Sequence, residues 1–304
     1  MIPWTLPKNR LPLYLWGMNN LPYLNKEKIQ EFISSALQED VGDGDHSSLG
    51  AVPSEKVSSA KLLIKGDGTI GGLGLAKLIF HRVDPNLEVQ LLKSDGDEVS
   101  NGDIGLTVKG KAISILTSER LVLNCMQRMS GIASKTRRLT EMISHTKARL
   151  LDTRKTTPNF RMMEKWAVAI GGGQNHRFGL YDMIMLKDNH NDYAGGIPQA
   201  IKSAKAYLET NRLDLKIEVE TRNLDEVQQV LDTGGVDIIM LDNFQLEDLE
   251  KAVRLIGSSH QTEASGGITE ETIIPIAETG VDFISVGALT HSYNSLDISL
   301  KATE

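Results

Sequence analysis

From Ala148 onward, the chain alternates regularly between short strand-like runs and helical patterns. Repeated strand–helix units with short loops are typical of a parallel sheet, because each parallel crossover returns the chain through a helix. Six strand-like runs are visible, fewer than a complete (βα) barrel has, so the pattern predicts an α/β fold with an incomplete barrel of TIM type. The strand-like runs are residues 149–152, 182–187, 215–220, 237–242, 261–265 and 282–286, and the helical patterns are residues 160–170, 197–208, 224–231, 246–256 and 270–279.

Polar or small residues end each strand-like run. In a barrel, all carboxyl ends of the strands converge on one mouth, where barrel enzymes place their active sites, and this favours a barrel over a doubly wound sheet. Arg154 and Lys155 follow the first run and Lys187 follows the second, which indicates an anion site. The other strand ends carry Glu218, Glu220, Asp242, Asn243, Ser265, Gly266, Gly267, Ser285 and Gly287.

The N-terminal part has a different pattern. Apolar residues recur at helical spacing over 25–38, short strand-like runs between Gly and Asp-Gly turns fill 60–116, and an amphipathic helix follows over 117–144. We expect an N-terminal α/β sandwich domain over residues 25–130, which includes the start of the long helix, and a catalytic barrel over 131–290. Residues 1–24 are expected to form a poorly ordered leader, and 291–304 a C-terminal tail that can return to the N-terminal domain.

The composition argues against several classes of function. A net charge of −7 and a pI near 5.6 argue against nonspecific nucleic-acid binding, which needs a broad excess of Lys and Arg. The single cysteine, Cys125, leaves no intrachain disulfide, so we expect a reducing, cytoplasmic location. No run approaches the roughly 18 apolar residues of a membrane span, so no membrane association is expected.

Nine motifs follow one another between residues 36 and 292: ALQEDVGDGD (36–45), SERLVLNCMQRMSGIASKTR (118–137), DTRKTTP (152–158), GGGQNHR (171–177), LKDNH (186–190), EVE (218–220), LDN (241–243), EASGGI (263–268) and SVGALTHS (285–292). In this order they resemble the quinolinate phosphoribosyltransferase family, also called nicotinate-nucleotide pyrophosphorylase (carboxylating). Each motif alone is weak, but nine in one order are specific.

The resemblance implies a homodimer in which an N-terminal sandwich domain faces the incomplete barrel of the partner. It implies transfer of phosphoribose from phosphoribosyl pyrophosphate to quinolinate with Mg²⁺, which gives nicotinate mononucleotide, pyrophosphate and CO₂ in de novo NAD synthesis. It also implies that Arg120 reaches into the active site of the neighbouring subunit.

The family match assigns roles to the strand-end residues. Arginine suits planar carboxylates, so Arg154, Arg177 and the neighbouring subunit's Arg120 are expected to bind quinolinate. Lys155 is expected on the quinolinate or phosphate side. The remaining assignments are His176 and Lys187 near quinolinate, Glu220 and Asp242 beside the ribose and Mg²⁺, and Ser265, Gly266, Gly267, Ser285 and Gly287 around the 5′-phosphate.

Plainer interpretations stand beside these roles. The cations can be solvated surface charges or members of local salt bridges, and the two carboxylates can pair with Lys155 or Lys187. Glycines at strand ends can be ordinary turn residues, and a lone His such as His176 is more often structural. The resemblance itself leaves two rival functions, a related phosphoribosyltransferase for another acceptor and a non-catalytic phosphate sensor.

Four further features are interpreted as structural. The glycine triplet 171–173 is expected to stop a helix and to aim His176 and Arg177. The acidic run over 40–45 lacks the full calcium-loop pattern, so turn and capping duties are expected there. Cys125 with Met126 and Met129 is expected to pack in a core or an interface. Asn159 stands where the family usually has Gly, and Asn tolerates a left-handed backbone there.

Overall fold

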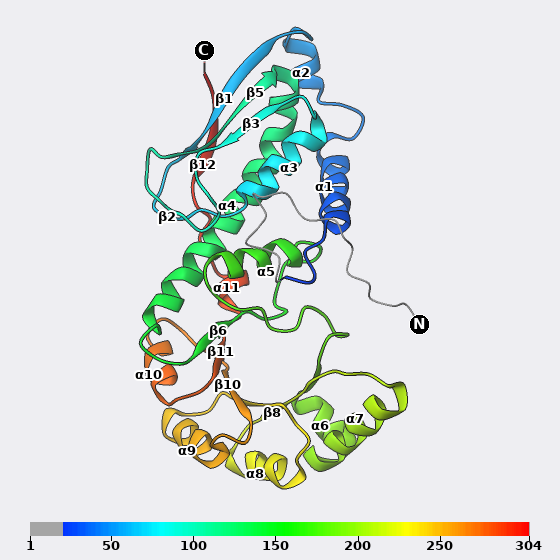
Figure 1. Cartoon of the computed structure of the whole chain (residues 1–304), viewed down its shortest axis with the longest axis vertical. Coiled ribbons are helices and arrows are strands. Elements are labelled where there is room, and N and C mark those ends of the chain that lie inside the picture. Colours follow the sequence, from blue (N-terminus) through cyan, green and yellow to red (C-terminus); the bar gives the residue numbers. More distant parts are fainter. Residues whose placement is uncertain (1–20, 304) are drawn as a thin grey trace. The chain divides into compact units, whose positions relative to one another are not determined.

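The computed structural model describes residues 21–303, so the expected leader lies outside the described residues except for 21–24. The chain divides into two compact units. The first contains residues up to 133 with 162–170 and 294–304, and the second contains 134–161 and 171–293. Figure 1 shows the elements of both units along the chain.

The first unit is built on an antiparallel sheet of four strands in the order β12-β1-β5-β3. The last strand of the chain, β12, pairs along β1, with Ser59 opposite Thr303 and Ile64 opposite Ile298. The C-terminal residues therefore complete the N-terminal sheet. The strands of this unit are β1 (Val57–Ile64), β2 (Gly68–Thr69), β3 (Glu88–Leu91), β4 (Glu98–Val99), β5 (Ile104–Lys111) and β12 (Ile298–Thr303).

Helices pack with this sheet and bury the sulfur-containing side chains. Cys125, Met126 and Met129 are at most 2% exposed, which confirms their expected place in a core. Asp45 caps α2 by accepting a hydrogen bond from the Ser48 N–H, as expected for a capping residue. The helices are α1 (Lys26–Val41), α2 (His46–Ala51), α3 (Leu73–Val83), α4 (Ala112–Met142), which continues into the second unit, and α5 (Arg161–Ile170).

One helix falls inside the segment expected to be rich in strands. α3 buries Leu75, Ile79 and Phe80 at helical spacing. Asp95, from a distant loop, accepts hydrogen bonds from the Leu73 and Gly74 N–H groups and so satisfies donors at the start of the helix. No helix is predicted for this segment from the sequence, and the residue that satisfies the start of α3 is distant in sequence.

The second unit is a parallel sheet of six strands in the order β6-β11-β10-β9-β8-β7. This is the order of strands wound in one direction around a barrel, and no pairing between β6 and β7 closes the ring within the described residues. The prediction of an incomplete α/β barrel is confirmed. The strands are β6 (Arg149–Leu151), β7 (Ile184–Leu186), β8 (Ile217–Thr221), β9 (Ile238–Asp242), β10 (Gln261–Ser265) and β11 (Phe283–Ser285).

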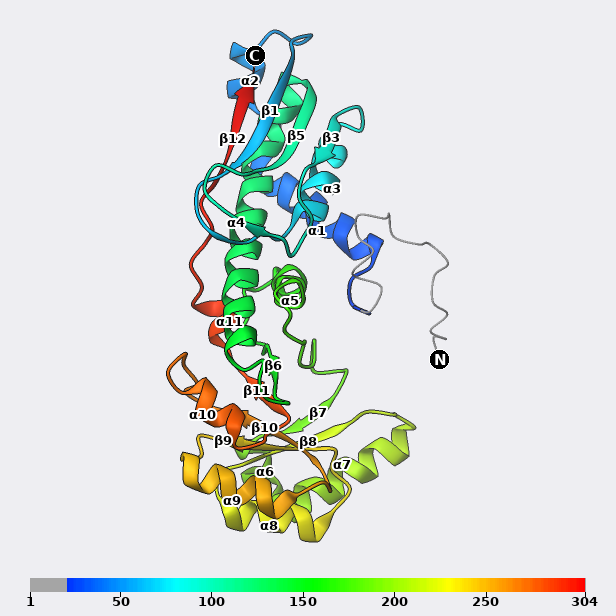
Figure 2. The same ribbon diagram turned by 60° about the vertical axis from the view of Figure 1, so that its left-hand side comes forward.

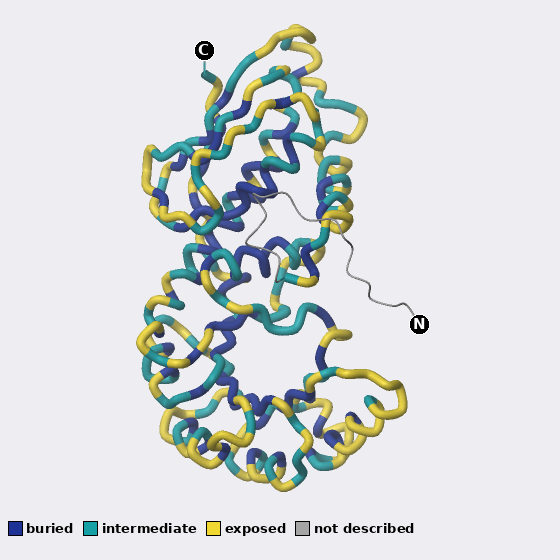
Figure 3. The backbone as a smooth tube through the Cα atoms, in the orientation of Figure 1, coloured by how far each residue is buried: buried dark blue, intermediate teal, exposed yellow. Residues whose placement is uncertain are grey.

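Helices cover the outside of this sheet. Figure 2 shows α7, α8 and α9 along one face of the strands, and Figure 3 shows that the strands are largely buried while these helices carry exposed turns. α5 ends at Ile170, directly before the glycine triplet, so the expected helix stop is confirmed. The helices are α6 (Asp188–Ala194), α7 (Ile197–Asn211), α8 (Leu224–Thr233), α9 (Leu246–Ile256), α10 (Ile273–Glu278) and α11 (Ala288–His291).

A left-handed turn follows the first strand of the second unit. Asn159 has φ 61°, so the expected left-handed turn is present in the loop after β6. No helix among the described residues is long and apolar enough to cross a membrane.

Candidate active site

A pocket of about 600 Å³ opens at the carboxyl ends of the six parallel strands. All of its lining residues belong to the second unit. Most of the site residues expected from the sequence line this one pocket: Arg154, Lys155, His176, Arg177, Lys187, Glu220, Asp242, Ser265, Gly266, Gly267 and Ser285. Arg120 lies on α4 in the first unit and is exposed.

Two guanidinium groups lie close together in the pocket. Burial, followed by repulsion from Arg154, lowers the pKa of Arg177. One nitrogen of Arg177, Nη1, donates to the Met183 carbonyl at 3.1 Å, which anchors the group. Arg154 Nε is buried and has no hydrogen-bond partner among the described residues. A buried, unsatisfied charged donor is costly unless a ligand completes it, so this pair suits an anion.

Lys155 is held beside the glycine that follows β11. The Thr290 hydroxyl donates to the Lys155 carbonyl at 2.8 Å. A Cβ on Gly287 would lie 2.8 Å from Lys155 Cδ and 3.2 Å from His291 Nε2, so a larger residue there would displace the Lys155 side chain. Ser285 Oγ, at the end of the same strand, is buried and has no hydrogen-bond partner in the described part of the chain. The end of β11 therefore offers polar groups to a ligand.

Two carboxylates, Glu220 and Asp242, end the adjacent strands β8 and β9. Burial, followed by repulsion from Asp242, raises the pKa of Glu220. Asp242 Oδ2 accepts a hydrogen bond from Asn243 Nδ2 at 2.6 Å. Because the two negative groups repel each other across the pocket, a cationic ligand at this point would stabilise both.

The turn after β10 brings backbone close to Asn243, the residue that follows Asp242. Gly266 has φ 92°, and a Cβ there would lie 2.3 Å from Asn243 Oδ1 and 2.8 Å from Asn243 N. The next residue, Gly267, has φ 60° and open space around its Cα. Gly266 is thus required both by its backbone conformation and by its close approach to the turn after β9.

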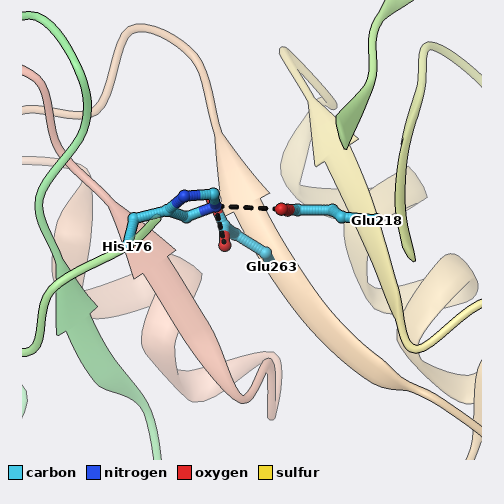
Figure 4. A group of neighbouring side chains, drawn as sticks. All are labelled: His176, Glu218 and Glu263. Carbon is cyan, nitrogen blue, oxygen red and sulfur yellow. Dashed lines mark hydrogen bonds and ion pairs between the residues drawn. The ribbon is translucent and has the colours of Figure 1, made fainter. Parts of the chain in front are cut away.

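His176, Glu218 and Glu263 form a buried imidazole–carboxylate cluster (Figure 4), and His176 and Glu263 also line the pocket. His176 Nε2 is 2.9 Å from Glu218 Oε2 and 3.4 Å from Glu263 Oε2. Both carboxylate side chains are 0% exposed, and the His176 side chain is 8% exposed. Burial, followed by repulsion from Glu263, raises the pKa of Glu218.

The hydrogen-bond partners of the two ring nitrogens indicate how His176 is protonated. Burial lowers the pKa of His176, but the hydrogen bonds and charges of Glu218 and Glu263 outweigh burial and raise it to about 10, which favours the imidazolium. Nδ1, however, accepts a hydrogen bond from the Arg177 N–H at 2.8 Å. A proton on Nδ1 as well would point at the Arg177 N–H, and two donors cannot form a hydrogen bond with each other. We therefore assign one proton to the ring, on Nε2.

Asp152 secures the other side of the same turn. It is fully buried at the end of β6. One of its oxygens accepts from the His176 N–H at 2.9 Å and the other from Asn175 Nδ2 at 2.6 Å. The segment that carries His176 and Arg177 is therefore fixed to the end of the first barrel strand.

Comparison with known proteins agrees with this arrangement. The model of the N-terminal domain of quinolinate phosphoribosyl transferase matches residues 45–130, and the model of its C-terminal domain matches residues 132–301. The chain belongs to the quinolinate phosphoribosyltransferase family.

Relatives in this family are similar over almost the whole chain. The quinolinate phosphoribosyltransferase (decarboxylating) 2b, mitochondrial, of Nicotiana tabacum is 47% identical over 288 residues, which are 90% of this chain and 82% of that protein. The nicotinate-nucleotide pyrophosphorylase (carboxylating), chloroplastic, of Arabidopsis thaliana is 46% identical over 288 residues, which are also 90% of this chain and 82% of that protein. The solved nicotinate-nucleotide pyrophosphorylase from Francisella tularensis has a TM-score of 0.86 at 38% identity and covers 92% of this chain and 98% of that one.

Several pocket residues of this family member received no role from its sequence. Glu263, Met240 and Asn243 line the pocket. Glu218 and Glu263 each stand two residues before a predicted site residue, on strands that are otherwise buried. A charged residue in the middle of a buried parallel strand breaks the apolar pattern expected there. That break was the available signal for both carboxylates.

Proposed function

We propose that this chain transfers phosphoribose from phosphoribosyl pyrophosphate to quinolinate and releases CO₂ and pyrophosphate, with nicotinate mononucleotide as the product. The observation that carries the proposal is the pairing of Arg154 and Arg177 in one pocket with an unsatisfied, buried Arg154 Nε. The relatives are named for this reaction. The reaction belongs to de novo NAD synthesis.

The charge of the substrates fits the pocket. Quinolinate has two ring carboxylates, and the donor has a phosphate and a pyrophosphate, so the site must stabilise many negative charges together. Arg154 and Arg177 suit the carboxylates because a guanidinium donates two parallel hydrogen bonds to one carboxylate. Lys155 and Lys187 supply compact positive charges to phosphate oxygens or to a carboxylate.

The donor phosphate fits the glycine turns. Gly266 and Gly267 let the backbone approach a ligand closely, and Ser285 Oγ is a buried hydroxyl without a hydrogen-bond partner among the described residues. Lys155 lies against Gly287 at the end of the next strand. These groups are the proposed 5′-phosphate site.

In the proposed reaction, the quinolinate ring nitrogen attacks the anomeric carbon of ribose as the bond to pyrophosphate breaks. Positive charge develops on the sugar, and Glu220 and Asp242 stabilise it because both are carboxylates aimed into the pocket. The nitrogen then carries a positive charge, so the adjacent carboxylate leaves as CO₂ and its electron pair stays on the ring carbon next to the nitrogen. A proton completes the product. The guanidinium groups hold the ring in place for both steps.

The residues present fit Mg²⁺. Glu220 and Asp242 are oxygen ligands, the repulsion between them raises the pKa of Glu220, and a cation relieves that repulsion. Mg²⁺ held by these carboxylates, partly through water and substrate, would neutralise negative charge on the pyrophosphate.

A homodimer with a shared active site is part of the proposal. Arg120 is exposed on α4, in the first unit, whereas the whole pocket belongs to the second unit. An exposed cation in the family's Glu-Arg motif suits a role in the pocket of a neighbouring subunit. We also propose a reducing compartment because Cys125 is unpaired and buried; the plant relatives are named as mitochondrial or chloroplastic, so the cytoplasm and an organelle are both open to test.

The decisive experiment follows CO₂ and nicotinate mononucleotide together, with phosphoribosyl pyrophosphate, Mg²⁺ and quinolinate, and with nicotinate replacing quinolinate in a parallel reaction. The proposal expects both products in equal amounts from quinolinate and none from nicotinate. If the folded protein makes no product, the function must be sought in another acceptor or in phosphate sensing.

A further inference from the structure

The buried imidazole–carboxylate cluster (His176, Glu218 and Glu263) has no role in the proposed chemistry. Its carboxylates come from β8 and β10 and converge on the same ring nitrogen of His176 (Figure 4). The register places Glu220, Met240 and Glu263 in one row across β8, β9 and β10. Glu218 lies two residues before Glu220 on β8, so it shares the sheet face of that row. Two buried carboxylates under a pocket of cations call for a physical explanation, because each costs free energy unless it has a donor.

Both ring nitrogens of His176 already have protein partners. Nε2 donates to Glu218 Oε2 at 2.9 Å, with Glu263 Oε2 at 3.4 Å. Nδ1 accepts from the Arg177 N–H at 2.8 Å. With both positions engaged, His176 has no ring nitrogen left for a substrate carboxylate. Its effect on the substrate must pass through Arg177.

This step rests on the proposed function. We infer that Glu218 and Glu263 are positioning residues, which hold His176 as the Nε2–H tautomer so that Nδ1 fixes the backbone of Arg177 in the quinolinate half of the pocket. Asp152 holds the His176 N–H from the other side. Glu218 thus acts on quinolinate binding through two hydrogen bonds in series, from His176 Nε2 to Glu218 and from the Arg177 N–H to His176 Nδ1, and Glu263 adds an ion-pair contact to the same Nε2. The phosphate turns after β10 and β11 take no part in these contacts.

A bound divalent cation is the competing explanation of the cluster. The three ligand atoms lie within 4.8 Å of one another. Oε1 of Glu218 and both carboxylate oxygens of Glu263 have no hydrogen-bond partner among the described residues. A histidine that binds a metal through Nε2 carries its proton on Nδ1. The Arg177 N–H occupies that position, so the geometry favours the hydrogen-bonded tautomer.

The first test reads the tautomer in the unmodified protein. With ¹⁵N-labelled histidine, the His176 ring should show a protonated Nε2 and an unprotonated Nδ1, identified by the loss of its signals in His176→Asn. A protonated Nδ1, or a divalent metal that stays bound in stoichiometric amount after dialysis against a chelator, would overturn the inference. This test does not depend on turnover, so it separates failure of the inference from failure of the proposed function.

The second test uses kinetics. Glu218→Ala should raise the KM for quinolinate by at least about tenfold, the order expected for a lost hydrogen bond to a charged group, and leave the KM for phosphoribosyl pyrophosphate within about twofold. Glu218→Gln keeps an oxygen that accepts from Nε2–H and should stay within about threefold of the parent for quinolinate. Equal changes in both KM values, or a Gln variant as impaired as the Ala variant, would contradict a positioning role.

A matched control exists on the surface of the same unit. Glu278 pairs with His145 at 3.1 Å, and both side chains are about half exposed. Glu278→Gln should change neither KM. If Glu218→Ala does not fold, Glu263→Gln replaces it, with the same expected preference for quinolinate but a smaller effect because its distance to Nε2 is 3.4 Å.

Discussion

Replacing Gly266 with alanine tests the close contact between the turns after β9 and β10. The new Cβ would lie 2.3 Å from Asn243 Oδ1 and 2.8 Å from Asn243 N, and the φ of 92° is unfavourable for any residue with a Cβ. Backbone strain of about 1 to 2 kcal/mol and an overpacking cost of about 1 to 3 kcal/mol predict a total loss of roughly 2 to 5 kcal/mol in the free energy of unfolding.

Gly267 supplies the comparison. It also has a positive φ, 60°, but a Cβ there meets nothing within 4 Å. Gly267→Ala should therefore lose only the strain, about 1 to 2 kcal/mol. Gly234→Ala, with φ 65° and open space in the loop after α8, should behave like Gly267→Ala. Urea unfolding of the three variants measures the difference that the clash alone contributes.

The same clash should weaken binding of the phosphoribosyl donor. Asn243 is the neighbour of Asp242 and donates to it, so a displaced Asn243 moves the proposed ribose carboxylate. Calorimetric titration with phosphoribosyl pyrophosphate should show weaker binding for Gly266→Ala than for Gly234→Ala. Two results together would refute the steric argument: equal unfolding free energies for the Gly266 and Gly267 variants, and equal donor affinity for the Gly266 and Gly234 variants.

Three further outcomes are expected. Arg154→Ala should cost about 2 to 5 kcal/mol in kcat/KM for quinolinate, because it removes a partly buried partner of an anion; activity within twofold of the parent would remove Arg154 from the site. A mixture of Arg120→Ala and Lys155→Ala chains should recover activity that neither has alone, and no recovery after proven subunit exchange would argue against a shared site. Burial by itself raises the pKa of Asp282. The hydrogen bonds that its carboxylate accepts from Lys147 and from the Thr262 N–H outweigh burial and lower the pKa. Asp282→Asn should therefore lower the free energy of unfolding by about 1 to 3 kcal/mol near pH 7. The stability difference between parent and variant should disappear as the pH falls below 3.8 and through the lowered pKa of Asp282. A difference that stays constant down to about pH 2 would contradict this cause.

The order of the barrel elements could be predicted because one physical rule governs them. A parallel strand needs a crossover helix, so the alternation of patterns after Ala148 predicts both the sheet and the edge at which its polar residues meet. The strand at 261–265 and the helix at 246–256 agree with the structure to the residue. Boundaries differ more at the expected strand over 182–187, where the structure has Ile184–Leu186.

Contacts between distant strands could not be predicted in the same way. Glu218 and Glu263 lie on separate strands, β8 and β10, and both contact His176, which lies in the loop after α5; a single sequence does not contain the pairing that puts them on one face of the sheet. Asp95, which accepts a hydrogen bond from the Leu73 N–H at the start of α3, is likewise distant from that helix in the sequence, so no local pattern indicated it. Local chemistry was easier to anticipate, since Asn159 has the left-handed backbone expected of an Asn in place of Gly.

The order of the strands also explains how one pocket serves two opposite charges. The edge strands β6 and β7 are followed by cations, Arg154 and Lys187, whereas the inner strands β8 and β9 carry carboxylates, Glu220 and Asp242, at their carboxyl ends. Arg154 and Lys187 can therefore stabilise anionic groups from the two edge strands, and a sugar that gains positive charge is stabilised over β8 and β9. A closed ring would bring β6 and β7 together and place their cations side by side. The incomplete barrel keeps these strands apart, so the cations can hold the substrates on both sides of the carboxylates.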